Sequence, residues 1–473
     1  MKEDQPIFIP TPQQSQALQQ LKLFLAAPGS GVFILKGYAG TGKTTLLQHV
    51  ALTLRKQKKP FVLLAPTGRA ATVLRAKTGL EARTIHSELY HFSDIDGDAA
   101  EDVISPDANQ FGQMRLMFSL RPSNNNDKKL YIVDEASMIS DEPGDPTSYA
   151  HFGSGHLLSD LLHVTGTNKI IFSGDPCQLP PVGSINSPAL NEIWMTKQGK
   201  MVNSFELTDI LRQKKGSDIL QLATTVRNLT QLKNYPKWVK LPAIKKQQVD
   251  LLSHADQKIL YTNHIRQFGS EDSIAVCHSN FNCADINRTV RKVLYNDPNA
   301  PLQEGDVLMV TQNNYLVPLT NGDFVEVIHI GMEQSHLGIR FIRITVKAQL
   351  TGKEHELLLC NEVLFNGQAN LTADQQRMLM IDFSKKMRVK GIKPKSEKYF
   401  SELKTDPYLN SLRANFGYAV TCHKSQGGEW DHVFLFLHKG MYNMGPQALT
   451  RWWYTGITRA KKQLYLVHDW WIQ

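Results

Sequence analysis

Apolar runs rich in β-branched residues alternate with amphipathic segments along the first third of the chain. The runs GVFILK, FVLLAPT, LYIVDEAS and NKIIFSGD each end in a small or acidic residue, and segments such as TTLLQHVALTLRK lie between them. Apolar strands that alternate with amphipathic helices are typical of a parallel α/β sheet. Such sheets bind their ligands at the carboxyl ends of the strands. The pattern therefore predicts an α/β fold with its functional site at those ends.

Two stretches interrupt this alternation. Between Ile85 and Lys129 the sequence is polar, acidic and rich in Asn, which predicts an inserted subdomain. A second α/β pattern begins near VNSFELTDILRQ, continues with the strand SIAVCHSN, and resumes after Asn415 with GYAVTCHKSQGGEWDHVFLFL and QLYLVHD. Between its halves, short β-rich runs with Asn-Gly and Gly-Asp turns predict a small inserted barrel, followed by a basic helical segment.

These interruptions divide the chain into two lobes with one insertion each. We predict a first lobe of residues 1–85 with 129–200, around an insertion at 86–128. The second lobe would contain residues 201–300 with 413–473, around an insertion at 301–412. A chain of 473 residues is long enough for two to four domains.

Composition narrows the class of protein. The chain is 41% hydrophobic and 21% charged, which is typical of a folded globular protein. Its net charge of +9 suggests a polyanionic partner without proving one. The five cysteines are odd in number and form no CxxC pair, so a disulfide framework or paired-cysteine zinc site is not supported and a reducing compartment fits best. Without a signal-peptide pattern or a run of about 18 apolar residues, we expect a soluble, cytoplasmic protein with no membrane contact.

The nonapeptide GYAGTGKTT matches the pattern GxxxxGK[ST] between a predicted strand and a predicted helix. Its glycines would let backbone N–H groups close on phosphates, Lys43 would reach the β and γ oxygens, and Thr44 would hold Mg²⁺. A glycine-rich turn without a ligand is the alternative for an isolated match. The flanking strand and helix favour a site for ATP or GTP. The predicted nucleotide-binding residues are Gly37, Gly40, Thr41, Gly42, Lys43, Thr44 and Thr45.

Further candidate catalytic residues follow later strands. After LYIV, Asp134 would orient Mg²⁺ and Glu135 would activate the attacking water, although a pair of solvated carboxylates is the alternative. In FSGDPCQLPPV, Gln178 would sense the γ-phosphate. Arg212 in LTDILRQ and Arg459 in YTGITRAKK would stabilise charge on the transferred phosphoryl group. Because both arginines lie in the second lobe, we expect the nucleotide between the lobes, where it would close and open them.

Nine motifs occur in the order found in superfamily 1 DNA helicases. They are Gln14 in TPQQSQAL, the P-loop, APTGRAATVL, TIHS, VDEASM, GDPCQLPPV, LTDILRQ, AVTCHKSQGGEW and YTGITRAKK. The whole chain resembles the RecD, Dda and Pif-like branch, to which TIHS and AVTCHKSQG point. The resemblance implies a P-loop NTPase with two RecA-like lobes, a 1B insertion with a wedge or pin, an SH3-like 2B barrel, and ATP with Mg²⁺ as cofactors. The segment that follows VDEASM looks longer than in the compact phage type.

The resemblance also implies residue roles. Gln14 would read adenine, and Gly428 with Glu429 would meet the ribose. The predicted DNA-contacting residues are Pro66, Thr67, Arg69, His86, Phe118, Thr421, His423 and Lys424. Phe118, in RLMFSLR, is also a candidate for a strand-separating pin, because aromatic platforms stack on single-stranded bases.

Each of these assignments has a structural alternative. His86 and His423 would otherwise be buried, hydrogen-bonded histidines, and Arg69 would be a solvated helix cation. Aromatic side chains such as Phe118 belong more often to a core.

The sequence thus predicts an ATP-dependent helicase that moves 5′ to 3′ on single-stranded DNA and unwinds duplex during replication, recombination or repair. The polarity depends on the resemblance alone. Expected partners are single-stranded and forked DNA, with single-strand-binding or recombination proteins, and the active form would be a monomer. Two alternatives stay open. One is a helicase-like, DNA-stimulated ATPase subunit of a larger recombination nuclease complex, and the other is an RNA helicase, since 2′-hydroxyl contacts cannot be read from a sequence.

Overall fold

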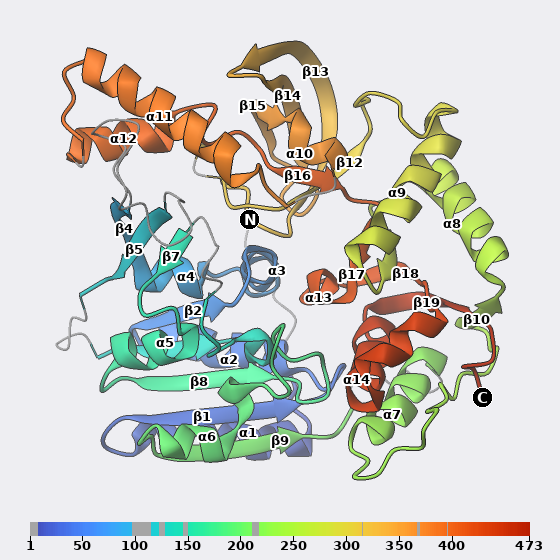
Figure 1. Cartoon of the computed structure of the whole chain (residues 1–473). Coiled ribbons are helices and arrows are strands. Elements are labelled where there is room, and N and C mark those ends of the chain that lie inside the picture. The colour runs from blue at the N-terminus through green and yellow to red at the C-terminus, as the bar shows by residue number, and fades with distance from the viewer. Residues whose placement is uncertain are drawn as a thin grey trace.

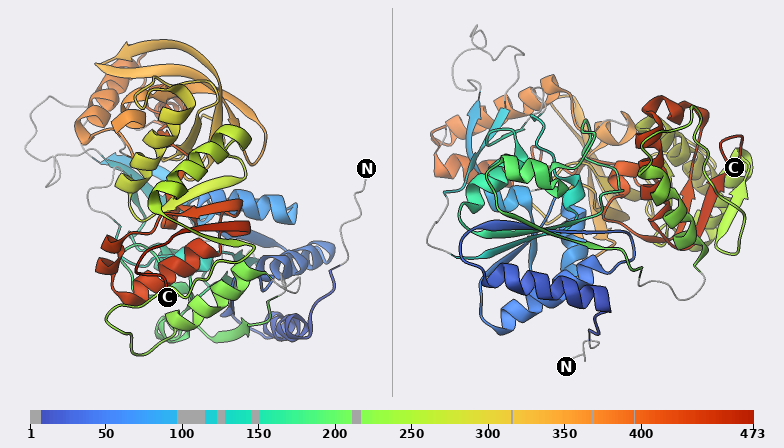
Figure 2. Two further views of the ribbon diagram at one scale, coloured as in Figure 1. Left: turned by 90° about the vertical axis from the view of Figure 1, so that its right-hand side faces the viewer. Right: turned by 90° about the horizontal axis from the view of Figure 1, so that it is seen from below.

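Two parallel-sheet lobes lie side by side, and two smaller β-rich parts lie above them in the view of Figure 1. Figure 2 shows the same arrangement from two other sides. The predicted α/β fold with two parallel-sheet lobes is confirmed. The computed structural model describes residues 8–96, 115–122, 128–144, 150–210, 217–314, 316–366, 369–394 and 396–473.

The first lobe is a six-stranded parallel sheet in the order β3-β2-β6-β8-β1-β9. Alternate residues of β1 face opposite sides, so Phe33 and Leu35 pack on α1, α2 and α3, whereas Val32 and Ile34 pack on α4, α5 and α6. The strands are β1 (Gly31–Gly37), β2 (Phe61–Ala65), β3 (Ala82–Thr84), β6 (Leu130–Val133), β8 (Lys169–Gly174) and β9 (Val202–Leu207). The helices are α1 (Pro12–Ala26), α2 (Lys43–Lys56), α3 (Gly68–Thr78), α4 (Ile85–Leu89), α5 (Leu157–Thr165) and α6 (Glu192–Lys197), with 3₁₀ turns at Ala136–Met138 and Pro188–Leu190.

The boundary between the lobes differs from the prediction. We placed the start of the second lobe at residue 201, but β9 pairs in parallel with β1, from Val32 opposite Val202 to Gly37 opposite Leu207. The first lobe therefore extends to Leu207. Hydrophobic patterning identifies a strand but does not show which sheet the strand joins, and this is why the boundary was misplaced.

The second lobe is a five-stranded parallel sheet in the order β10-β19-β18-β11-β17. Its halves are distant in sequence but adjacent in space, because Ala275 of β11 lies opposite both Ala419 and Phe434. The strands are β10 (Val249–Leu252), β11 (Ser273–Cys277), β17 (Ala419–Thr421), β18 (Trp430–Leu435) and β19 (Ala460–Val467). The helices are α7 (Asp218–Thr230), α8 (His254–Phe268), α9 (Asn280–Tyr295), α13 (Cys422–Ser425) and α14 (Pro446–Ile457), with a 3₁₀ helix at Lys439–Met444.

The insertion in the first lobe contains a three-stranded sheet in the order β4-β5-β7. Strands β4 (Tyr90–Asp96) and β5 (Arg115–Leu120) lie within the predicted insertion. Strand β7 (Ala150–Phe152) comes from the long segment after the acidic pair and runs parallel to β5, with Phe152 opposite Phe118. That segment therefore completes the sheet of the insertion.

The insertion in the second lobe is a five-stranded antiparallel sheet in the order β15-β14-β13-β12-β16. We placed Ala414–Phe416 in the second lobe, but this strand pairs with β12 and belongs to the insertion. The elements are β12 (Val307–Val310), β13 (Phe324–His336), β14 (Ile339–Ala348), β15 (Glu354–Cys360), β16 (Ala414–Phe416), α10 (Asn361–Asn366), α11 (Ala373–Val389) and α12 (Glu397–Thr405). The SH3-like barrel stays a prediction. Within the described residues, we find no helix that combines the length and apolar character needed to cross a membrane.

Candidate functional site

The P-loop connects the carboxyl end of β1 to the start of α2. Gly40 and Gly42 have φ angles of 81° and 79°, which side-chain-bearing residues rarely adopt. A Cβ at Gly37 would lie 2.8 Å from the hydroxyl oxygen of Thr41. Lys43 Nζ donates to two carbonyl oxygens of the loop, at 2.7 and 3.1 Å, so its ammonium lies within the curve of the loop. This narrow, lysine-containing turn at a helix N-terminus fits a phosphate group.

A hydroxyl and a carboxylate meet beside the P-loop. Thr44 Oγ1 donates to Asp134 Oδ2 at 2.8 Å, and Ser173 Oγ donates to Asp134 Oδ1 at 3.0 Å. Hydroxyl and carboxylate oxygens are the ligands that Mg²⁺ prefers. The residues present therefore fit a Mg²⁺ ion next to the phosphates, with Thr44 and Asp134 as its candidate ligands.

Glu135 lies where charges from both lobes meet. Burial raises the pKa of its carboxyl group, and the neighbouring Asp134 raises it further, whereas Arg459 and Lys43 lower it. A carboxylate with a raised pKa is suited to accept a proton from water. Lys43 of the first lobe and Arg459 of the second therefore both lie close enough to this carboxylate to change its pKa.

The loop after β8 supplies two more polar groups. The Asp175 carboxylate accepts hydrogen bonds from the Tyr454 hydroxyl at 2.7 Å and from the Cys177 N–H at 2.9 Å. The buried Oε1 of Gln178 has no hydrogen-bond partner within the part of the chain that the structure describes. An unpaired buried acceptor is costly, so this atom fits a site where a ligand or a water supplies the missing donor.

Arg459 is held by its own lobe. Its guanidinium donates to the carbonyl oxygens of Thr455 at 2.9 Å and Gly428 at 3.1 Å, and to the hydroxyl of Thr458 at 3.0 Å. The neighbouring Glu429 lies 3.9 Å from the ammonium of Lys77 in the first lobe. Arg212, the other predicted arginine, lies outside the described residues.

Gln14 is buried against the P-loop. Its Nε2 donates to the Thr41 carbonyl oxygen at 3.2 Å, and its Oε1 accepts from the Thr11 N–H at 3.2 Å, which forms part of a capping box on α1. The side chain therefore fixes the first helix to the P-loop. Its contact with adenine stays a prediction.

Arg69 lies at a junction of three parts of the molecule. Its guanidinium lies 4.6 Å from the ring centroid of Phe324, in the second insertion, and 4.7 Å from that of Trp430, in the second lobe. The backbone of α3 lies close to the second insertion here, because a Cβ at the adjacent Gly68 would lie 1.9 Å from Thr320 Oγ1. Burial lowers the pKa of Arg69 to about 10. The alternative of a solvated helix cation is therefore wrong, and the placement favours an interdomain contact over a phosphate contact.

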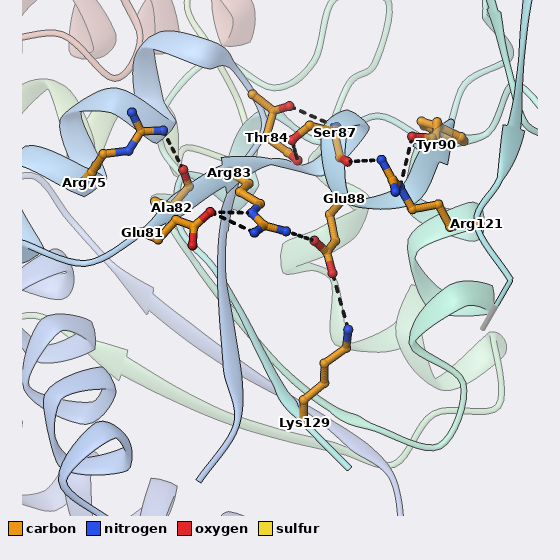
Figure 3. Close-up of polar contacts among 10 residues, drawn as sticks. All are labelled: Arg75, Glu81, Ala82, Arg83, Thr84, Ser87, Glu88, Tyr90, Arg121 and Lys129. Carbon is orange, nitrogen blue, oxygen red and sulfur yellow. Dashed lines mark hydrogen bonds and ion pairs between the residues drawn. The ribbon is translucent and has the colours of Figure 1, made fainter. Parts of the chain in front are cut away.

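Polar contacts fix α4, the short helix of the TIHS motif, to its surroundings (Figure 3). Thr84 caps the helix by accepting from the Ser87 N–H at 3.1 Å, and Arg121 donates to the Ser87 carbonyl oxygen at 3.4 Å. Glu88 lies 3.3 Å from Arg83 and 3.5 Å from Lys129, which flank the insertion on both sides. The helix is thus tied to both ends of the inserted segment.

His86 and Phe118 lie in an aromatic cluster. The His86 ring centroid is 5.0 Å from that of Phe152, and Phe118 stacks on Phe152 at 4.6 Å. Phe92 lies 5.4 Å from Phe118 and 4.8 Å from Phe400 of α12, so the cluster reaches the second insertion. Burial lowers the pKa of His86 to about 4. Phe118 packs against the core of the first lobe, which is the structural alternative for it, whereas these ring contacts do not choose between the two interpretations of His86. The contacts of both residues with DNA stay predictions.

The remaining predicted DNA-contacting residues follow strand ends in both lobes. Thr67, after β2, caps α3 by accepting from the Ala70 N–H at 3.2 Å, and Pro66 precedes it. In the second lobe, Thr421 and Lys424 line a cavity of about 150 Å³. Burial lowers the pKa of Lys424, and burial together with His278 lowers that of His423.

The sequence did not assign roles to Asp175 and Tyr454, although both lie within motifs that it identified. Asp175 directly follows a predicted strand, and its position at the carboxyl end of that strand could have identified it as a candidate site residue. No local signal could pair Asp175 with Tyr454, because the two residues are 279 positions apart.

Comparisons with known proteins find two matching family models and several relatives that align with most of this chain. Residues 10–235 match a family model described as an AAA domain, and residues 416–467 match the UvrD-like helicase C-terminal domain. An uncharacterized protein of Acanthamoeba polyphaga mimivirus is 23% identical over 96% of this chain and 98% of its own length. The ATP-dependent RecD2 DNA helicase of Deinococcus radiodurans is 24% identical over 96% of this chain and 48% of its own length. The chain thus spans about half of the Deinococcus protein.

Solved structures show the same fold. A Pif1 helicase from Bacteroides, in complex with ADP-AlF3 and single-stranded DNA, has a TM-score of 0.50 and 17% sequence identity. The similarity covers 99% of this chain and 94% of that chain. A structure that describes DNA unwinding at forked duplex by two coordinating Pif1 helicases also has a TM-score of 0.50, with 16% identity over 98% of this chain and 94% of that chain. The similarity therefore extends over both lobes and both insertions.

Proposed function

Because this chain belongs to the RecD and Pif1 branch of the superfamily 1 DNA helicases, we propose that it hydrolyses ATP to move 5′ to 3′ along single-stranded DNA and to separate duplex ahead of it. One observation carries this proposal. The lobes meet at the P-loop, where the Tyr454 hydroxyl of the second lobe accepts from the Ala39 N–H at 3.0 Å, and Lys43 and Arg459 from different lobes both lower the pKa of Glu135. A nucleotide bound there would contact both lobes, so its binding and hydrolysis would change their separation.

Each residue of the site would have its own role in ATP hydrolysis. The P-loop amides and Lys43 would bind the phosphates, with Thr44 and Asp134 as ligands for Mg²⁺. A bound Mg²⁺ would neutralise phosphate charge. Glu135 would accept the proton of the attacking water, Gln178 would orient that water, and Arg459 would stabilise charge on the transferred group. The 5′ to 3′ direction is part of the proposal, and it is consistent with the family.

Unwinding of tailed duplexes tests the proposal. We expect ATP-dependent strand separation of a duplex with a 5′ single-stranded tail, and little from a matched duplex with a 3′ tail or blunt ends. Glu135→Gln is the matched control, because it keeps the size of the side chain and removes the proton acceptor. Unwinding only from 3′ tails would contradict the direction, and no ATP-dependent unwinding of any substrate would contradict helicase activity by the chain alone.

A second candidate function is a motor subunit of a recombination nuclease complex. The RecBCD enzyme subunit RecD of Buchnera aphidicola is 22% identical over 94% of this chain and 72% of its own length. A purified chain that hydrolyses ATP in the presence of single-stranded DNA but unwinds none of the tailed duplexes would favour this candidate.

A further inference from the structure

Tyr454, on α14 of the second lobe, reaches the nucleotide site of the first lobe. Its hydroxyl accepts a hydrogen bond from the Ala39 N–H of the P-loop at 3.0 Å. The same hydroxyl donates to Asp175 Oδ2, in the loop after β8, at 2.7 Å. The side chain is almost completely buried. One phenol oxygen therefore joins three segments that surround the candidate phosphate site.

Thr455, the next residue of α14, contacts the loop after β8. Thr455 Oγ1 accepts from the Leu179 N–H at 2.9 Å. The carbonyl oxygen of Leu179 accepts from Nε2 of Gln426 at 3.0 Å. Gln426 is the C-terminal cap of α13, the helix that carries His423 and Lys424. The loop is thus connected both to α14 and to a segment predicted to contact DNA.

Helix α13 also contacts α14 directly. The thiol of Cys422 donates to the Trp452 carbonyl oxygen at 3.6 Å, two and three residues before Tyr454 and Thr455, which contact the P-loop and the loop after β8. A shift of α13 would therefore be transmitted through α14 to the Ala39 amide. The contacts among α13, α14 and the loop after β8 are buried, and the Ala39 contact is partly buried, so these hydrogen bonds are stronger than the same bonds would be in water.

We propose that Tyr454 is a positioning residue that transmits occupancy of the single-strand track to the P-loop. When DNA orders α13, α14 would hold the Ala39 amide and the Asp175 carboxylate in the arrangement that favours hydrolysis. The inference depends on the proposed function, because it requires an ATPase that responds to DNA. It adds a residue that acts on the phosphate-binding loop from the opposite lobe without contacting the nucleotide.

Tyr454→Phe tests this role, because it keeps the ring and removes only the hydroxyl. The measured quantity is the stimulation factor, the ATPase kcat with saturating oligo-dT divided by kcat without DNA. We expect this factor to fall about tenfold, which corresponds to the loss of one to two buried hydrogen bonds. The Kd for the oligonucleotide, from fluorescence anisotropy, should stay within about twofold of the wild-type value, because the variant does not alter the DNA-contacting residues.

Tyr442→Phe is the matched control. Tyr442 lies in the same lobe and donates to the Val239 carbonyl oxygen at 2.6 Å, so its variant also loses one hydrogen bond. We expect a wild-type stimulation factor for it. If Tyr454→Phe does not fold, Thr455→Val provides the second variant, because it removes the acceptor of the Leu179 N–H at nearly constant volume, and its stimulation factor should also fall.

The outcomes separate the positioning role from the proposed function. A wild-type stimulation factor in both Tyr454→Phe and Thr455→Val would overturn the positioning role while leaving the helicase proposal intact. An equal loss of stimulation and of DNA affinity would also overturn it, because it would indicate a general structural defect. A wild-type protein whose ATPase does not respond to single-stranded DNA would overturn both proposals.

Discussion

At the scale of single residues, the proposed role of Glu135 as the base that activates water depends on its protonation. Its pKa is raised by burial and by Asp134, and the positive charges of Arg459, Lys43 and Lys77 oppose the rise. A raised pKa means that the carboxylate becomes protonated at a higher pH than an ordinary glutamate, whose reference value is 4.5. The protonated form cannot accept a proton, so activity should be lost as the pH falls through the raised pKa.

Glu135→Gln should lower the ATPase kcat by about 10²- to 10⁴-fold, the usual contribution of a general base. The nucleotide should still bind, because Lys43 and the P-loop amides are unchanged. The wild-type pH profile of kcat should have an acid limb above pH 4.5 that is absent from the variant. Steady-state ATPase assays across pH provide both measurements. A variant with wild-type kcat would contradict the assigned role.

At the scale of elements, α3 contacts both the second insertion and the second lobe. It begins in the first lobe, and its Arg69 packs between Phe324 of the second insertion and Trp430 of the second lobe. Cation–π contacts contribute about 0.5 to 1 kcal/mol at exposed sites and about 2 kcal/mol when desolvated. The junction therefore favours one orientation of the second insertion relative to both lobes.

Arg69→Met should lower the free energy of unfolding by about 1 to 3 kcal/mol, because it removes the cation–π contacts and a positive charge near the buried Asp323. Thermal unfolding measures this effect, and Lys22→Met, which also removes one positive charge but at an exposed position of α1, is the control. The dependence of single-stranded DNA affinity on salt should keep its wild-type slope. If the slope of log affinity against log salt concentration were reduced by about one while stability stayed unchanged, the result would instead indicate that Arg69 contacts a phosphate.

Elements that depend on local patterning were predictable from the sequence, and those that depend on distant pairing were not. The P-loop, the acidic strand end and the helical nature of α11 and α12 follow from spacing and periodicity over a few residues. The sheet that β9 or β7 joins depends instead on a pairing partner that is distant in sequence, β1 for β9 and β5 for β7. The burial of Arg69 depends on two aromatic rings from other parts of the chain, and this information is absent from the motif PTGRAA.

At the scale of the whole molecule, the two lobes are joined by contacts that surround the candidate nucleotide site. Ala39 and Leu179 of the first lobe are held by Tyr454 and Thr455 of the second. Arg459 of the second lobe lowers the pKa of Glu135 in the first. The central claim is therefore that a nucleotide between the lobes controls their separation.

Distance measurement between the lobes tests this claim. Lys22 of α1 and Gln267 of α8 are exposed, one in each lobe, and both can be replaced by Cys. The five native cysteines are all buried, so dyes should attach selectively to the two new thiols. Glu135→Gln in the same background would prevent turnover, and Lys43→Ala would serve as the control without productive nucleotide binding.

Energy transfer between the two dyes, followed as Mg²⁺-ATP and then ADP are added, is the most direct measurement. We predict higher transfer efficiency with ATP than without nucleotide, a return toward the starting value with ADP, and no response in the Lys43→Ala control. Transfer efficiency that stays constant while ATP binding is demonstrated in the same sample would contradict a motor driven by movement of the lobes.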